Sequence, residues 1–346
     1  MINKSVNNHY VPQMYLKEWS NDGKIFEYRL LVSHEKVPYW SERSIKRTAS
    51  IDNLYTTVEN GAETDTLEKM FDAKFENPAK KSISKVICAE DLSGDDWKAL
   101  INYVLAQYVR TPAFYAFSRT VFKNIMDDEI DRIADTYKSF DISEINEWNK
   151  NYQLHYRLPI SIEITDIKND SAHTMVKIET IVGKEYWFFA INHVLNKNSP
   201  IYKLFHGYKW GIITTDEDSP VPTCDNPFVV AKDLFQASYT KSNWIAGDDK
   251  VWLFPLSPHK VLFASRKRKY GWRINANKEM SNRIKELVIK NAFLFAYNYY
   301  PDDEITKYRK RLVDENEFKR INKELQNLYH NYINEEVPLL KKNLVF

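Results

Sequence analysis

Residues 97–112 read WKALINYVLAQYVRTP and contain the clearest helical pattern in the chain. Apolar side chains recur there at three- and four-residue spacing, the period of an α-helix with a buried face. They are Trp97, Leu100, Ile101, Val104, Leu105, Tyr108 and Val109. Thr111-Pro112 ends the pattern, because the residue before a proline avoids the α-helical region. The stretch therefore predicts a buried helix that carries Arg110 in its last turn.

Strand-like and helical segments occupy separate blocks on either side of this helix. Strands that do not alternate singly with helices argue against a doubly wound parallel sheet. We therefore predict one α+β domain over 1–346, with a largely helical body and antiparallel sheet segments from the N-terminal region and from residues around 205–265. Its parts are N-terminal strands with a short helix (1–60), the helical body (64–195), strands (205–265) and C-terminal helices (276–335).

Three local patterns make this architecture specific. The residues from about Ser171 to Leu195 have a helical pattern that is interrupted at Gly183, and apolar residues from Met280 to Phe295 define a C-terminal helix. Asp65 followed by Glu68 resembles a capping box, which predicts a helix start at this point.

The composition is that of a globular protein with no strong overall charge. Hydrophobic residues make up 43% and charged residues 28% of the 346 residues. The formal net charge is +2, so the whole chain has no strong attraction for nucleic acid. Aromatic residues reach 14%, which fits either aromatic-lined surfaces or an aromatic core, and the core is the favoured interpretation.

The chain has no pattern that directs it to a membrane or out of the cell. The first residues contain no apolar signal segment, and the longest apolar runs are too short to cross a bilayer. Cys88 and Cys224 lie far apart and lack zinc-type spacing, which favours reduced thiols. We expect a cytoplasmic protein with no membrane partner, and the oligomeric state stays open.

Several common catalytic motifs are absent. The sequence contains no Walker-type phosphate loop, GxGxxG, HExxH, CxxC or GxSxG. Common nucleotide-binding, zinc-protease and serine-hydrolase mechanisms are therefore not indicated.

His9 is the first candidate for chemistry, within the block His9-Tyr10-Val11-Pro12. Neutral imidazole serves as a general acid or base, or as a metal ligand, near pH 7. The alternative is a partly buried histidine that bonds a backbone carbonyl. Core packing does not demand such a block, so both interpretations stay open.

A second set of candidates lies on the helices. Glu68, Asp72 and Glu76 follow each other at four-residue spacing, so a continuous helix would carry them as one acidic stripe. Such a stripe can hold a divalent metal, although it is more often a solvated helix flank. Arg110 could clamp a phosphate or carboxylate, or simply interact with the helix C-terminus.

Two later segments complete the candidates. Asp225-Asn226 precedes Pro227 at a strand end, which is either ordinary turn chemistry or a loop that presents catalytic groups. A basic tract with interleaved aromatics suits phosphate contact and base stacking, or an exposed hairpin. Its candidate nucleic-acid contacts are Arg266, Lys267, Arg268, Lys269, Trp272 and Arg273.

The ordered set of short motifs resembles a widespread bacterial family of unknown function. The matching motifs begin with the His-Tyr-Val-Pro block and continue with a helix carrying two spaced glutamates. Arg-Thr-Pro, Asp-Asn-Pro and Pro-Leu-Ser-Pro follow, here at 110–112, 225–227 and 255–258. Usual members carry a serine or Thr-Ser-Asp before Asn-Pro, whereas this chain has Thr223-Cys224-Asp225. The resemblance implies no established activity, but it places His9, Glu76, Arg110, Asp225 and Asn226 in one pattern.

Two hypotheses follow. The first is a phosphodiesterase or nuclease, of a bacterial defence system against phage or of a toxin system, with one site built from His9, Glu76, Arg110 and Asp225. Its cofactor is left open, with Mg²⁺ or Mn²⁺ as the candidate metal held by Glu68, Glu76 and Asp225, and nucleic acid as the candidate partner. The second is a non-catalytic module that recognises a protein or a small anion.

Overall fold

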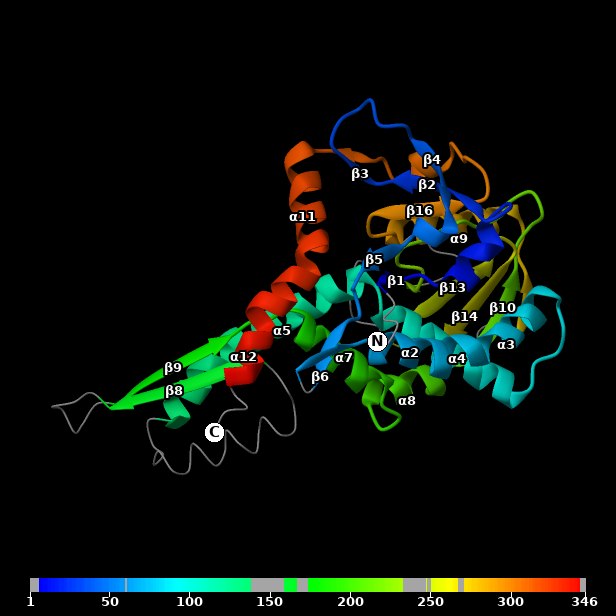
Figure 1. Ribbon diagram of the computed structural model, residues 1–346. Helices are drawn as coiled ribbons and strands as arrows, with labels where there is room; N and C mark the ends of the chain where they lie inside the picture. Colours follow the sequence, from blue (N-terminus) through cyan, green and yellow to red (C-terminus); the bar gives the residue numbers. More distant parts are fainter. Residues whose placement is uncertain are drawn as a thin grey trace. The chain divides into compact units, whose positions relative to one another are not determined.

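The computed structural model describes residues 6–59, 61–137, 159–166, 174–232, 247, 250–266 and 271–342. Within them the fold is α+β, as the sequence predicts (Figure 1). The chain divides into two compact units, each joined from separate stretches. Unit 1 consists of Met1–Phe114 and Val194–Gln326, and unit 2 of Tyr115–His193 and Asn327–Phe346. One domain over 1–346 stays a prediction.

The largest sheet of unit 1 has five strands in the order β12-β13-β14-β10-β15. All neighbours are antiparallel except β10 and β15. All residues of β13 are buried, because apolar groups cover both faces of this central region. The strands are β10 (Lys209–Thr214), β12 (Val229–Ala231), β13 (Val251–Ser257), β14 (Lys260–Ser265) and β15 (Arg273–Asn275).

A four-stranded sheet joins the two ends of unit 1 in the order β11-β16-β2-β4. Its strands are β2 (Lys24–Arg29), β4 (Trp40–Ser44), β11 (Thr223–Cys224) and β16 (Phe295–Asn298). The helix expected from Met280 to Phe295 in fact ends at Asn291, and Phe295 begins β16. The prediction of the helix end is wrong because the spacing of apolar residues cannot distinguish a short buried strand from the end of a helix.

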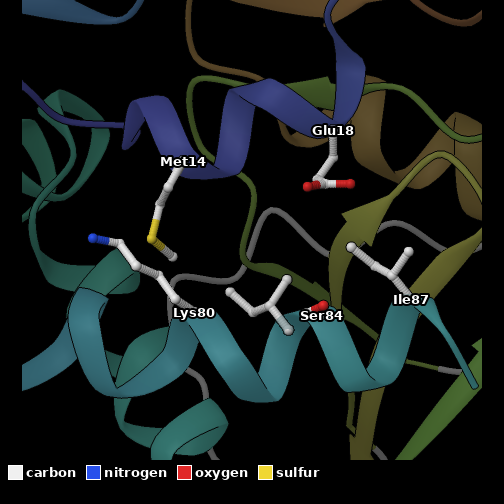
Figure 2. Close-up of a pocket in the computed structure, with 6 residues that line it drawn as sticks. Met14, Glu18, Lys80, Ser84 and Ile87 are labelled. Carbon is white, nitrogen blue, oxygen red and sulfur yellow. The ribbon is translucent and has the colours of Figure 1, made fainter. Parts of the chain in front are cut away.

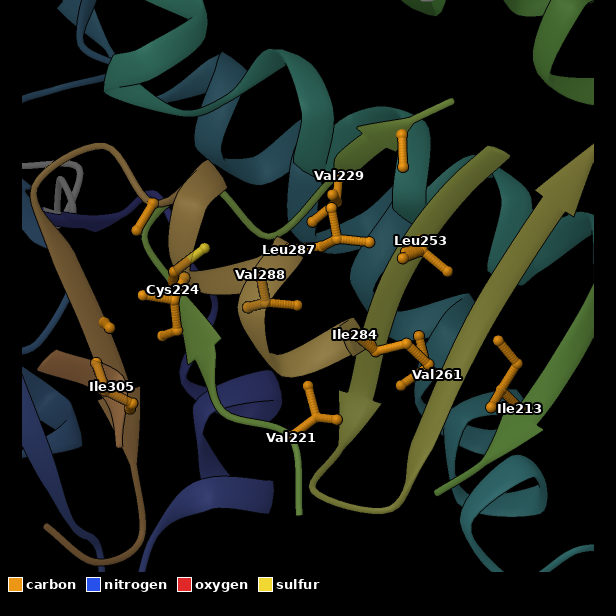
Figure 3. Close-up of a cluster of buried hydrophobic side chains, with 14 of the residues drawn as sticks. Ile213, Val221, Cys224, Val229, Leu253, Val261, Ile284, Leu287, Val288 and Ile305 are labelled. Atoms are coloured by element: carbon orange, nitrogen blue, oxygen red, sulfur yellow. The ribbon is translucent and has the colours of Figure 1, made fainter. Parts of the chain in front are cut away.

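Helix α9 (Lys278–Asn291) packs its apolar stripe on both sheets. Figure 3 shows Ile284, Leu287 and Val288 of this helix among side chains from the surrounding strands, including Val261 and Cys224. The removal of these apolar side chains from water is the main contribution to the stability of such a cluster.

The remaining elements of unit 1 include helical segments and short strand pairs. The helical segments are α1 (Gln13–Leu16), η1 (Lys17–Trp19), η2 (Ile45–Arg47), α2 (Thr66–Phe71), η3 (Asp72–Glu76), α3 (Asn77–Ile87), α4 (Gly94–Val109), α8 (Pro200–Gly207), α10 (Ile305–Tyr308) and α11 (Glu315–Asn331), which runs on past Gln326. The paired short strands are β1 (Asn7–His9) with β5 (Ser50–Asp52), β3 (Leu31–Val32) with β17 (Leu312–Val313), and β6 (Thr57–Glu59) with β7 (Ala62–Thr64).

Unit 2 contains most of helix α5 (Pro112–Tyr137) and a hairpin of β8 (Ile160–Asp166) and β9 (Thr174–Thr180). It also contains most of α7 (Lys184–Leu195), together with η4 (Tyr332–Glu336) and α12 (Val337–Lys342). The helix expected from about Ser171 to Leu195 is therefore wrong in its first half, where β9 lies. Gly183 separates this strand from the helix that follows it.

No helix of the described ranges combines the length and the apolar character that a passage through a membrane requires.

Candidate polar site around Arg110

Helix α4 positions Arg110, which follows its last residue as the C-cap. The helix starts with a capping box formed by Ser93 and Asp96. Most of the predicted apolar face is buried, whereas Trp97 and Tyr108 are half-buried. Arg110 and Thr111 separate it from α5, which begins at Pro112. Arg110 is only 1% exposed, so its charge is held inside the fold and needs partners there.

The guanidinium of Arg110 has partners from three different parts of the chain. One terminal nitrogen donates to Glu76 Oε1 at 2.5 Å, and the other donates to the backbone carbonyl of His9 at 2.5 Å. Glu68 Oε2 lies 3.9 Å from the second nitrogen. Burial by itself would lower the pKa of Arg110, but Glu76, Tyr55 and Glu68 raise it above its ordinary value, so the residue stays charged.

Aromatic rings complete the surroundings of this guanidinium. Its central carbon lies 4.5 Å from the ring centre of Phe71 and 5.5 Å from that of Tyr55. The Tyr55 hydroxyl also donates to the backbone carbonyl of Arg110 at 2.5 Å. These rings exclude water and add a favourable interaction with the cation.

The two glutamates reach Arg110 because the helix between them is not a regular α-helix. Segment η3, from Asp72 to Glu76, is a π-helix, and α3 restarts directly after it with Pro78 in its first turn. A π-turn widens the helix and breaks the four-residue register, and such turns are frequent at functional sites. Asp72 is exposed, whereas Glu68 and Glu76 lie against Arg110, so the predicted three-residue acidic stripe is wrong.

Glu68 differs from Glu76 in its hydrogen bonding. Its Oε2 atom is buried and has no hydrogen-bond partner among the described residues. Burial raises the pKa of this carboxyl to about 7, although Arg110 opposes the shift. The side chain as a whole is 23% exposed.

The capping box expected from Asp65 and Glu68 is absent. Asp65 makes no side-chain cap for α2 and instead forms an ion pair with Lys69 at 2.7 Å.

His9 contributes its backbone to this cluster as well as its ring. The ring Nε2 lies 3.3 Å from the carbonyl of Ile45, and the side chain is 8% exposed. Burial lowers the pKa of His9, so the imidazole is neutral near pH 7. This environment matches the backbone-bonded histidine that the sequence analysis weighed against a catalytic one.

Sequence reasoning missed two buried polar side chains that hold the cluster together. Gln107 donates to the carbonyl of Tyr10 at 2.7 Å, and Asn8 accepts a hydrogen bond from the Tyr55 backbone N–H at 3.1 Å. A polar Gln107 on an apolar helix, one turn before Arg110, was the signal that could have indicated a contact between this helix and the N-terminal block.

Asp225 and Asn226 contact a different set of residues in unit 1. Asp225 is 2% exposed and accepts hydrogen bonds from three consecutive backbone N–H groups of residues 293–295 at 2.6–3.0 Å. Burial raises its pKa to about 7, and the three N–H donors oppose that shift. Asn226 exchanges hydrogen bonds with Asn291. No hydrogen bond or ion pair joins Asp225 to Arg110 in the described part of the chain.

Of the expected metal ligands, Glu68 and Glu76 both lie next to Arg110, whereas Asp225 contacts the backbone of residues 293–295. Where the structure describes the chain, no group of three or more His, Cys, Asp and Glu side chains is arranged to hold a metal ion. Glu68 and Glu76 face a guanidinium, and Asp225 faces backbone donors, so each carboxylate already has an electropositive neighbour.

The basic tract is described only at its ends. Arg266 and Trp272 are exposed, whereas Lys267, Arg268 and Lys269 lie outside the described residues. Arg273 donates to the carbonyls of Ala89 and Glu90 and pairs with Asp91, which links it to the loop between α3 and α4. Nucleic-acid contact by this tract stays a prediction.

Comparison with known proteins assigns the chain to a family. Residues 7–327 match the model described as "Protein of unknown function (DUF4238)", so the chain belongs to this family, as its ordered motifs suggested. No curated protein and no solved structure matches the chain.

Proposed function

We propose that this DUF4238 protein hydrolyses phosphodiesters and that Glu68 is its general acid and base. The observation that supports this role is the state of its carboxyl. With a pKa raised to about 7, both protonation states are populated at neutral pH, as acid–base catalysis requires. Its buried Oε2 also has no hydrogen-bond partner in the described residues.

The neighbouring residues act as positioning groups in this proposal. Both terminal nitrogens of Arg110 are engaged by Glu76 and the His9 carbonyl, so Arg110 orients Glu68 rather than clamping a phosphate. Glu68 in its carboxylate form would take a proton from the attacking water. In its acid form it would return that proton to the leaving oxygen, which balances the reaction.

The substrate class rests on the basic tract. The exposed Arg266 and Trp272 are residue types that contact phosphates and stack on bases. A nucleic acid is therefore the proposed substrate, with Mg²⁺ or Mn²⁺ as the candidate additional cofactor. The free thiols Cys88 and Cys224 support a cytoplasmic, reducing location, and a role in bacterial defence against phage or as a toxin belongs to the same proposal.

The test compares two nearly isosteric variants on the same helical segment. Purified protein is incubated with DNA, RNA and tRNA, with and without Mg²⁺ or Mn²⁺. Glu68→Gln removes the titrating group and should lower the rate by at least about 100-fold. Asp72→Asn changes an exposed carboxylate nearby and should keep most of the activity. Equal rates for wild type and Glu68→Gln would disprove the role of Glu68.

A non-catalytic binding module is the second candidate, and one observation favours it. Arg110 and Asp225 both use their hydrogen-bonding groups inside the fold. A cluster of this kind stabilises structure without performing chemistry. If no substrate is cleaved under any condition, while Glu76→Gln strongly destabilises the protein, the binding module becomes the better description.

A further inference from the structure

A second polar feature of unit 1 is a pocket of about 390 Å³ between the α1–η1 segment and helix α3. Its size falls within the range of small-molecule sites. In Figure 2, Met14 lies opposite Lys80, and Glu18 lies opposite Ile87 at the other end of the pocket. The residues that line it are Met14, Glu18, Lys80, Ile83, Ser84 and Ile87.

The α1–η1 segment and helix α3, which form the two walls of the pocket, are both held in place by contacts with the rest of unit 1. Tyr15 forms a 2.6 Å hydrogen bond with Thr223 through their hydroxyls, and Trp19 Nε1 donates to the carbonyl of Val221 at 2.8 Å. The neighbouring stripe of α3 is buried at Ala79, Ile83 and Val86. The pocket is therefore preformed, which reduces the entropy that a ligand would lose on ordering its site.

The pocket carries one charge of each sign at its two ends. Glu18 is partly buried, and in the described residues it forms no hydrogen bond and no ion pair; burial raises its pKa. Lys80 donates to Asn77 Oδ1 at 2.5 Å, which uses one of the three donors of an ammonium group. Glu18 thus lacks a cationic partner inside the pocket, and Lys80 keeps donors for an anion.

Apolar groups lie between these charges. Met14 is a flexible thioether that adapts to different shapes, and Ile83 and Ile87 lie on the same side of α3. Lys80 and Ile87 are seven residues apart, which corresponds to about 10 Å along a helix. The lining therefore fits a chain of methylene groups with a charge at each end.

We propose that this pocket binds an aliphatic zwitterion, with its ammonium group at Glu18 and its carboxylate at Lys80. The methylene chain lies against Met14, Ile83 and Ile87. The proposal concerns a site other than Glu68 and does not depend on phosphodiester hydrolysis.

Isothermal titration of the whole protein with aminooctanoate, octylamine and octanoate tests the pairing of charges. Wild type should bind aminooctanoate at least about tenfold more tightly than either ligand with a single charge. Glu18→Gln should remove the advantage over octanoate, and Lys80→Met the advantage over octylamine. Lys81→Met, an exposed neighbour that does not line the pocket, is the matched control and should bind like wild type.

Ser84→Trp provides a second test, because Ser84 is exposed and its replacement fills the pocket from the rim. This variant should lose binding of all three ligands while keeping the melting temperature of wild type. The proposal is overturned if wild type binds none of the ligands. It is also overturned if Glu18→Gln, Lys80→Met or Ser84→Trp leaves aminooctanoate binding unchanged.

Discussion

Replacement of Glu76 by glutamine tests whether the Arg110 cluster holds unit 1 together. Removing one partner of a buried ion pair costs about 3–5 kcal/mol, because the remaining charge stays desolvated. Arg110 is almost fully buried, but the Glu76 side chain is 16% exposed, and Glu68 at 3.9 Å can take over part of the interaction. We therefore expect Glu76→Gln to lower the free energy of unfolding by about 2–4 kcal/mol.

The same geometry predicts that the stability losses caused by substituting Glu68 and Glu76 are not additive. Glu68→Gln alone leaves Glu76 at 2.5 Å from Arg110 and should be mild. The double variant leaves Arg110 without any carboxylate, so its loss should exceed the sum of the single losses by about 1–3 kcal/mol.

Urea unfolding followed by tryptophan fluorescence measures these values, since Trp19 and Trp252 are buried in unit 1. Glu63→Gln is a suitable control, because Glu63 is an exposed carboxylate on β7. A loss below about 0.5 kcal/mol for Glu76→Gln would refute the reasoning, since surface substitutions produce changes of this size. Strict additivity in the double variant would refute it equally.

Three further predictions follow from single contacts. The pKa of Glu68 in the folded protein, about 7, lies above its ordinary value of 4.5. The protonated carboxyl therefore stabilises the fold fully below pH 4.5, and this stabilisation is lost as pH rises through 7. Urea titrations at several pH values should show the free energy of unfolding declining by about 2–3 kcal/mol over this interval, and Glu68→Gln should remove that decline. Gly183→Ala places a methyl group against the Glu336 carboxylate, which accepts hydrogen bonds from the backbone N–H groups of residues 184 and 185. The melting temperature should therefore fall, and adding Glu336→Ala should restore part of the loss. Asn277→Ala removes the side-chain cap at the Met280 N–H of α9 and should cost about 1 kcal/mol in urea unfolding, whereas no change would contradict the capping role.

Local patterns predicted the elements near Arg110 better than they predicted chemistry. The helix ending at Arg110 and the short helix expected within 1–60 are both present. These features depend on residues a few positions apart, so the sequence pattern contains them directly. The acidic stripe failed because a single π-turn changes the register without any clear sequence signal.

The sequence by itself determined the α+β class, the family motifs and the presence of Arg110 at the end of a buried helix. Only the tertiary structure decided what that residue contacts. Glu76 lies 34 positions from Arg110 and His9 lies 101 positions from it, and both distances are closed by packing of separate elements. Side-chain periodicity reports which face of an element is buried, but it does not report which other buried face meets it. For the same reason Asp225, which has a family motif of its own, bonds to residues 293–295 instead of joining Arg110.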